Sequence, residues 1–291
     1  MMPLLRLLRP HQWVKNGFVF LGLLFGHAWA DPARVTLAID AFVAFCLVSS
    51  AVYVMNDIVD RERDRAHPKK RKRPLASGTV SMAAAIVLML VCGGAGLAMA
   101  WIGGGALPGI FFGYVALNVG YSFGLKHVVI LDVFLIAAGF MLRILAGTLG
   151  IGIAPSQWLL LTGLLLTLFL GFAKRRAELS ALQEDSGTHR RVLEHYSEPL
   201  LDQMITVAAA GVIVAYALYT VSPDTIRLHG TDKLIYTLPF VLYGMFRYLY
   251  LLHRRGGGGE PALEIVRDPH LVAAGAGWLG LTLWLLVNPV L

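Results

Sequence analysis

The feature that most constrains this chain is a succession of apolar runs, each long enough to cross a lipid bilayer. A spanning helix needs about 20 mostly apolar residues, within a range of about 17–25. Hydrophobic residues make up 57% of the 291 residues, and only 15% are charged. Because soluble domains are about 25% charged, the sequence excludes a water-soluble globule and predicts an all-α integral membrane protein.

We expect nine transmembrane helices that form a single polytopic membrane domain, residues 1–291. The expected spans are residues 17–30, 35–55, 80–102, 106–123, 128–151, 157–173, 203–221, 234–252 and 271–291. The first run has no small-residue cleavage site after a short apolar core, so it does not resemble a removable signal peptide. The two cysteines, Cys46 and Cys92, lie inside apolar runs and are typical of inert packing residues.

The distribution of lysine and arginine predicts the orientation. Of the 25 such residues, 20 lie on the side of the N-terminus, and the opposite loops hold only Arg34, Arg227 and Lys233. Loops rich in these residues stay in the cytoplasm. We therefore expect a cytoplasmic N-terminus and an external C-terminus. The formal net charge of +7 also suits anionic substrates.

The first charged loop, residues 56–78, carries three aspartates at helical spacing. Asp57, Asp60 and Asp64 are related as i, i+3 and i+7, so on one helix they share a face, with Asn56 beside it. Three carboxylates repel one another unless a cation lies among them, and oxygen ligands with a phosphate partner suit Mg²⁺. The pattern favours a diphosphate bridged by Mg²⁺. The alternative is a solvated helix end with balanced charges, and the basic run 69–73 is typical of a topology signal at anionic lipid.

A second constellation lies inside an apolar run. Asp132 and Arg143 are eleven residues apart, which places them within about 20° on one helical face and roughly 16 Å apart along the axis. Ionisable residues in a membrane span usually face a polar cavity, and the alternative is a structural ion pair between helices. Other cationic groups open the cytoplasmic ends of spans: Lys15, Lys126, Lys174 and Arg175. The glycine run 256–259 suggests a mobile linker that closes as a lid, with plain disorder as the alternative.

The segment NDIVDRERD, residues 56–64, resembles the first motif of the UbiA superfamily of intramembrane prenyltransferases. The resemblance implies nine transmembrane helices, a cytoplasmic cap, a diphosphate bound through Mg²⁺ and a lateral portal to lipid. The second family motif is usually a DxxxD pair that holds another Mg²⁺. Here Asp132 is present, but the residue four positions later is Ile136, which argues against an ordinary aromatic prenyltransferase.

Further motifs resemble one branch of that superfamily, the decaprenyl-phosphate phosphoribosyltransferases. They are RPHQWVKN at 9–16, YSFGLKH at 121–127, SQW at 156–158 and KRRAEL at 174–179. This resemblance implies Mg²⁺-dependent transfer of 5-phosphoribose from 5-phosphoribosyl 1-diphosphate to a polyprenyl phosphate, with release of diphosphate. It also implies the plasma membrane of a bacterium, a role in cell-wall biogenesis through an arabinan precursor, and homo-oligomerisation. We expect no nucleic-acid partner.

The resemblance assigns roles to individual residues. Metal and diphosphate binding falls to Asn56, Asp57, Asp60 and Asp64, and substrate binding to Lys15, Asn56, Tyr121, Lys126, Arg143, Lys174 and Arg175. Asp57, Asp60, Asp64 and Asp132 are the expected catalytic residues, and Asp132 would orient the ribose or a cation. Two alternatives remain: a prenyltransferase that joins a prenyl diphosphate to an aromatic, quinone or haem precursor, and a non-catalytic lipid transporter.

Overall fold

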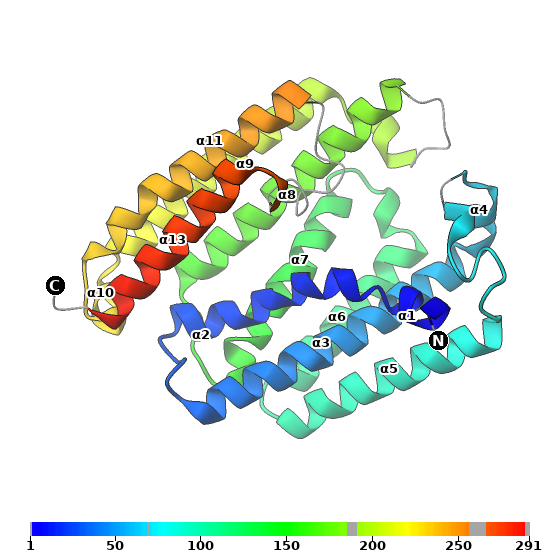
Figure 1. Cartoon of the computed structure of the whole chain (residues 1–291), viewed down its shortest axis with the longest axis horizontal. Helices are drawn as coiled ribbons and strands as arrows, with labels where there is room; N and C mark the ends of the chain where they lie inside the picture. Colours follow the sequence, from blue (N-terminus) through cyan, green and yellow to red (C-terminus); the bar gives the residue numbers. More distant parts are fainter. Residues whose placement is uncertain (1, 69, 185–190, 256–265, 289–291) are drawn as a thin grey trace. The chain divides into compact units, whose positions relative to one another are not determined.

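The computed structural model describes residues 2–68, 70–184, 191–255 and 266–288 (Figure 1). Every regular element in this part of the chain is a helix. The chain divides into an N-terminal unit, Met1–Lys126 with Ala138–Pro155, and a C-terminal unit, His127–Ala137 with Ser156–Leu291. Helix α7 (Leu131–Ala146) gives its first half to the C-terminal unit and its second half to the N-terminal unit.

The N-terminal unit is built around two long helices that lie side by side, α3 (Pro32–Val59) and α5 (Met82–Gly103) (Figure 1). The side chain of Asp31 accepts hydrogen bonds at the start of α3, and Ser81 does the same at the start of α5, so each helix has an N-cap. The other elements of the N-terminal unit are α1 (Met2–Leu8), η1 (Pro10–Phe20), α2 (Leu21–Phe25), α4 (Arg61–Ala66), η2 (Lys70–Lys72), α6 (Leu107–Phe123), η3 (Leu125–His127) and η4 (Leu149–Ile151).

The first expected span, residues 17–30, is not one continuous α-helix. Its residues lie in the 3₁₀-helix η1, the short helix α2 and the turn that follows. This segment approaches the end of α7 closely: a Cβ atom on Gly22 would overlap the backbone of Gly147, and one on Gly147 would overlap that of Val19. Only glycine permits such backbone contact, so these two positions allow the segment to lie against α7.

The C-terminal unit is organised around α8 (Gln157–Glu184) and α9 (Glu198–Val221), which lie side by side (Figure 1). Buried side chains such as Phe169, Leu201 and Ile205 form its core together with residues from the start of α7. Its other elements are η5 (Arg191–His195), α10 (Pro223–His229), η6 (Lys233–Thr237), α11 (Leu238–Arg255) and α13 (Pro269–Val287).

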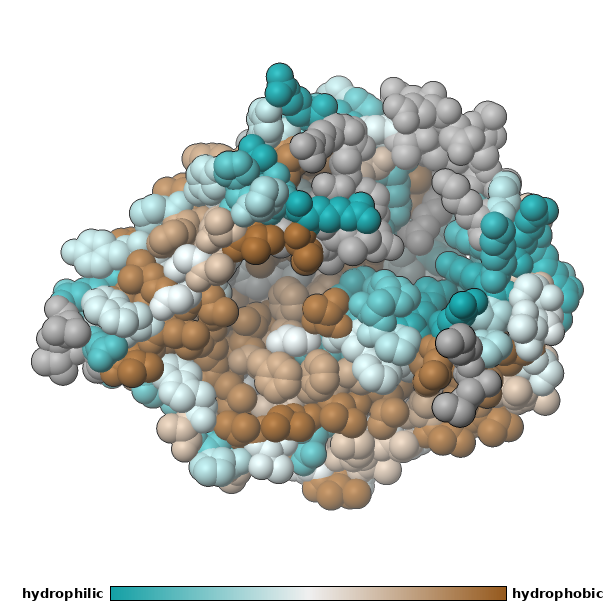
Figure 2. Space-filling model, viewed as in Figure 1, coloured by the Kyte–Doolittle hydropathy of each residue, from teal (hydrophilic) through white to brown (hydrophobic). Residues whose placement is uncertain are grey.

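Seven of the expected spans are confirmed among the described residues as helices long and apolar enough to cross a membrane. The apolar helix α6 is shorter, at 17 residues. Large apolar side chains on α5 are exposed, among them Leu90 at 63% and Ile102 at 84%, as expected of a surface in contact with lipid. Figure 2 shows apolar side chains over much of the visible face of α3 and α5, and hydrophilic ones gathered around α4. The protein is an integral membrane protein. The glycine run 256–259 lies outside the described residues.

Candidate functional site

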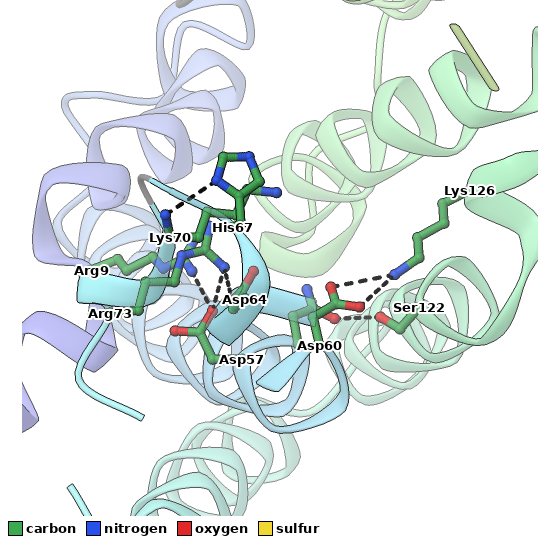
Figure 3. A network of polar contacts seen from close by, with 10 residues as sticks. Arg9, Asp57, Asp60, Asp64, His67, Lys70, Arg73, Ser122 and Lys126 are labelled. Carbon is green, nitrogen blue, oxygen red and sulfur yellow. Dashed lines mark hydrogen bonds and ion pairs between the residues drawn. The ribbon is translucent and has the colours of Figure 1, made fainter. Parts of the chain in front are cut away.

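The predicted aspartate stripe lies where α3 ends and α4 begins. Asp57 is in the last turn of α3, Asp64 is in α4, and Asp60 is the residue between the two helices. The backbone of Asp60, with φ −90° and ψ 5°, departs from helical values, so no single straight helix carries the stripe. As a result, Asp57 and Asp64 share one set of cationic partners, and Asp60 has another (Figure 3).

Asp57 and Asp64 are joined by the guanidinium group of Arg73. Nη1 of Arg73 lies 3.0 Å from Oδ1 of Asp57 and 2.7 Å from Oδ2 of Asp64. Nη2 of Arg9 lies 2.5 Å from the same Asp57 oxygen. Both carboxylates are only 3% exposed, and an ionised group at that depth is stable only when it is paired and hydrogen-bonded. The two arginines therefore neutralise the buried carboxylates.

Neither Arg9 nor Arg73 was predicted as a site residue, although both lie in motifs that the sequence singles out. Arg9 opens the RPHQWVKN motif, and Arg73 closes the basic run after the aspartates. The backbone of Arg9 is left-handed, with φ 51° and ψ 58°, which is uncommon for a residue other than glycine. Its guanidinium lies over the ring of Tyr53, 5.1 Å from the centroid. The surrounding contacts thus fix the direction in which Arg9 meets Asp57.

Asp60 instead pairs with a residue of η3, the short helix that follows α6. Nζ of Lys126 lies 3.2 and 3.4 Å from the two carboxylate oxygens of Asp60, so two predicted site residues 66 positions apart come together (Figure 3). The hydroxyl of Ser122 donates to the amide oxygen of Asn56. We refer to the residues around the α3–α4 junction as the polar cluster: Arg9, Asn56, Asp57, Asp60, Asp64, Arg73, Ser122 and Lys126. Lys15 in η1 and Tyr121 in α6 are half-buried residues of the same unit.

Arg143 is buried inside the N-terminal unit, at 6% exposure. Its Nε donates to Oδ1 of Asn16 at 2.8 Å, its Nη1 to the carbonyl oxygen of Gly139 at 2.7 Å, and its Nη2 to the hydroxyl of Tyr114 at 3.1 Å. The guanidinium carbon lies within 5.4 Å of the ring centroids of Phe45, Tyr114 and Phe140, a cation–π arrangement. Among the described residues of this unit, no carboxylate pairs with Arg143.

Asp132 belongs to the C-terminal unit and is fully buried, at 0% exposure. Its Oδ2 lies 2.7 Å from Nε of Arg175, and its Oδ1 accepts a hydrogen bond from the hydroxyl of Tyr196 at 2.8 Å. Nη1 of Arg175 also lies 2.5 Å from Oε2 of Glu178. Asp132 therefore forms an ion pair between α7 and α8. This is the alternative that the sequence left open, with Arg175 as the partner.

The cationic end of α8 is tied to α9 as well. Arg176 pairs with Glu198 and with Asp202, both at 3.0 Å. Lys174, two residues before Arg176 in α8 and half-buried, is a residue of the same unit. The structure thus distributes the predicted site residues over the two units. The N-terminal unit holds Lys15, Asn56, Asp57, Asp60, Asp64, Tyr121, Lys126 and Arg143, and the C-terminal unit holds Asp132, Lys174 and Arg175.

The donor atoms of the polar cluster fit Mg²⁺ in their chemistry. Three carboxylates and the amide of Asn56 supply hard oxygen ligands, which this ion prefers. As the side chains lie, no group of three or more His, Cys, Asp or Glu residues surrounds a metal-sized site in the part of the chain that the structure describes. Instead, Arg73 pairs with Asp57 and Asp64, and Lys126 pairs with Asp60, so the three carboxylates fall into two groups.

Acidic and basic groups side by side at the end of apolar helices can bind a metal–phosphate ligand. Carboxylates bind the cation, and guanidinium and ammonium groups bind phosphate oxygens, arginine as a fork and lysine as a point charge. The polar cluster contains all three kinds of group. The chemistry of the polar cluster therefore suits a metal–phosphate ligand.

Comparisons with known proteins agree on the family. The profile of the UbiA prenyltransferase family matches residues 17–262. A decaprenyl-phosphate phosphoribosyltransferase of Corynebacterium glutamicum is 36% identical over 285 residues, which is 95% of this chain and 84% of the relative. The enzyme of that name from Mycolicibacterium smegmatis is 33% identical over 289 residues, 95% of this chain and 90% of the relative. A solved UbiA homologue from Archaeoglobus fulgidus, bound to DMAPP and Mg²⁺, has a TM-score of 0.72 at 17% identity and covers 99% of both chains.

Proposed function

The chain belongs to the UbiA prenyltransferase family, and from that premise we propose that it is a phosphoribosyltransferase of the membrane. It transfers 5-phosphoribose from 5-phosphoribosyl 1-diphosphate to a polyprenyl phosphate and releases diphosphate. The observation that carries the proposal is that relatives alignable over nearly the whole chain are named decaprenyl-phosphate phosphoribosyltransferases. The absent second carboxylate at Ile136 supports this branch over a prenyltransferase.

In this proposal the polar cluster binds the diphosphate end of the donor. Asn56, Asp57, Asp60 and Asp64 are the residues that would hold Mg²⁺. When bound, the ion neutralises the charge that develops on the leaving diphosphate. Lys126 lies beside Asp60, so its ammonium group is available to a phosphate oxygen that approaches the same carboxylate.

The remaining substrate-binding residues carry the other phosphate groups. Donor and acceptor together bring three phosphates of the donor and one of the lipid, so the site needs several cations. Lys15, Tyr121 and Lys174 are proposed contacts to the donor. Arg143 is proposed to attract the lipid phosphate, because its buried charge is met by neutral groups in its own unit. The acceptor phosphate is already anionic, so the reaction requires no strong general base.

Asp132 and Arg175 act differently from the other proposed site residues. The guanidinium of Arg175 is 1% exposed and is held by Asp132 and Glu178. We propose that these residues support catalysis by maintaining the geometry at the end of α8, rather than by contacting the donor directly. Asp132 then orients a protein cation.

The proposed topology has nine crossings in one polytopic domain, with the N-terminus and the polar cluster in the cytoplasm of a bacterium and the end of α13 outside. The first crossing is η1 followed by α2. Eleven residues at about 2.0 Å and five at about 1.5 Å give about 30 Å, the thickness of the hydrocarbon core. Labelling of single cysteines placed at Arg63 and Asp224 from either side of a vesicle tests this orientation. Homo-oligomerisation is proposed from the family resemblance alone, and no nucleic-acid partner is proposed.

Reconstitution tests the proposed reaction. Purified protein is incubated with Mg²⁺, a polyprenyl phosphate and 5-phosphoribosyl 1-diphosphate labelled in the ribose. We expect label in the lipid fraction and one diphosphate released for each ribose transferred. The Asp224→Asn variant, altered at an exposed residue far in sequence from the cluster, serves as the matched control and should behave as the wild type.

Competition experiments distinguish the proposal from its rivals. With Mg²⁺ present, 5-phosphoribosyl 1-diphosphate should bind more tightly than geranyl or longer prenyl diphosphates. Tighter binding of the prenyl diphosphates, together with alkylation of an aromatic or quinone precursor, would favour the prenyltransferase. Binding of the lipid without any turnover would favour a transporter.

A further inference from the structure

The second charged motif of the chain departs from the family pattern in its sequence, and its buried aspartate is paired with a cationic side chain. The resemblance implies a second pair of aspartates that holds another Mg²⁺, and this chain has only Asp132, with Ile136 four residues later. The structure shows what meets the charge of Asp132 instead. The guanidinium of Arg175 lies 2.7 Å from one carboxylate oxygen, and the hydroxyl of Tyr196 lies 2.8 Å from the other.

A hydrated Mg²⁺ does not fit beside Asp132. This ion demands octahedral coordination and usually keeps several water molecules, whereas Asp132 is 0% exposed and Arg175 is 1% exposed. Glu178 is the other carboxylate of the arrangement, and it binds the same guanidinium at 2.5 Å. No third His, Cys, Asp or Glu completes a metal-binding group there among the described residues. A divalent cation would also have to sit close to the guanidinium charge, which repels it.

The backbone before Asp132 is tied into the same arrangement through Tyr196. Ile130 has a φ of +69°, a left-handed conformation that is a genuine outlier for a β-branched residue. Its N–H donates to the hydroxyl oxygen of Tyr196 at 2.7 Å, while that hydroxyl donates its proton to Asp132. Burial, more than any other factor, raises the pKa of Tyr196, so the hydroxyl stays protonated at neutral pH. Tyr196 thereby fixes both the turn that leads into α7 and the carboxylate.

We propose that the guanidinium of Arg175 permanently takes the place of a second metal ion at the second motif, so that Asp132 binds no divalent cation. Any divalent cation that the chain binds is then held elsewhere. The inference rests on the proposed function only in assigning that other site to the polar cluster. The ion pair between Asp132 and Arg175 stands independently of that assignment.

Metal-binding measurements test the proposal without turnover. Mn²⁺ is titrated into the full-length purified protein in the presence of inorganic diphosphate, and free Mn²⁺ is followed by electron paramagnetic resonance. Asp132→Asn should change neither the number of bound ions nor the dissociation constant by more than twofold. Loss of one ion, or a tenfold weaker dissociation constant, in Asp132→Asn would overturn the proposal.

The matched variant Asp64→Asn reports separately on the polar cluster. A dissociation constant at least tenfold weaker in this variant supports the proposed catalytic site. Unchanged binding in Asp64→Asn would overturn the metal assignment within the proposed function, while the Asp132 result would still decide the inference. The two failures are therefore distinguishable.

A double-mutant cycle tests the ion pair in case the single variants fold poorly or Mn²⁺ binding is weak. Asp132→Asn and Arg175→Gln should each lower the midpoint of thermal unfolding, because each leaves one buried charge without its partner. The double variant has neither charge and should recover a large part of either loss. Strictly additive losses would overturn the proposal whatever the metal titration shows.

Discussion

Arg143 offers a prediction in which the charge-conserving substitution is the more harmful one. Its three nitrogens donate in three directions, to Asn16, Gly139 and Tyr114. In Arg143→Lys a single ammonium nitrogen cannot occupy all three positions, so about two hydrogen bonds from a charged donor are lost. At about 1.5–3 kcal/mol each, the loss is about 3–6 kcal/mol. The cost of burying a positive charge remains undiminished.

Arg143→Met removes the charge together with the hydrogen bonds. Each acceptor left without a donor costs about 1–3 kcal/mol, but burying an ion, which costs several kcal/mol, is no longer necessary. The methionine stem can still pack against the rings of Phe45 and Phe140. We therefore expect the unfolding temperature to decrease in the order wild type, Arg143→Met, Arg143→Lys.

The assay is thermal unfolding in detergent with and without polyprenyl phosphate. A ligand at 100 times its dissociation constant stabilises the folded protein by about 2.7 kcal/mol. If Arg143 meets the lipid phosphate, both variants lose most of this stabilisation. The control Arg247→Lys, which alters an arginine paired with Asp268, should retain it. A lysine variant as stable as the wild type would refute the account of the buried cage. Full ligand stabilisation in both variants would refute the role in substrate binding.

Three further predictions concern other parts of the molecule. Asp60→Ala or Asp64→Ala should abolish turnover with little loss of folded protein on size-exclusion chromatography. Full activity in both variants would refute the hypothesis that these aspartates bind the metal ion. Burial raises the pKa of Tyr196 in the folded state. Its protonated hydroxyl therefore contributes fully to the free energy of unfolding below about pH 10, the pKa of the unfolded side chain, and this contribution should fall as the pH rises further. Tyr196→Phe should show a smaller fall between pH 9 and 11 by thermal unfolding, and identical profiles would contradict the assignment. Gly147→Ala should unfold the protein at a markedly lower temperature because its Cβ overlaps backbone atoms, whereas Gly244→Ala, which meets nothing nearby, should not.

The sequence alone was sufficient for the helical membrane architecture and for the acidic residues of the polar cluster, but not for its partners Arg9, Arg73 and Ser122. Apolar length and charge are local properties, because each run of about 20 apolar residues must satisfy its own backbone hydrogen bonds in lipid. The same local logic identified Asn56, Asp57 and Asp64 as polar residues at the end of an apolar run. It did not reveal that the helix ends at Asp60, nor that the carboxylate of Asp60 meets Lys126, a residue 66 positions away.

Partner choice was decided only by the tertiary structure. Asp132 and Arg143 share one face of a helix, and the sequence left open whether each faces a polar cavity or pairs with a charge on another helix. Folding instead gives Asp132 a guanidinium 43 residues away, and it gives Arg143 an amide 127 residues away. A buried charge must be satisfied by whichever groups the packing brings within about 3 Å, and sequence spacing carries no information about groups on other helices. The sequence therefore determined which charges enter the membrane domain, and the packing of helices determined how each one is neutralised.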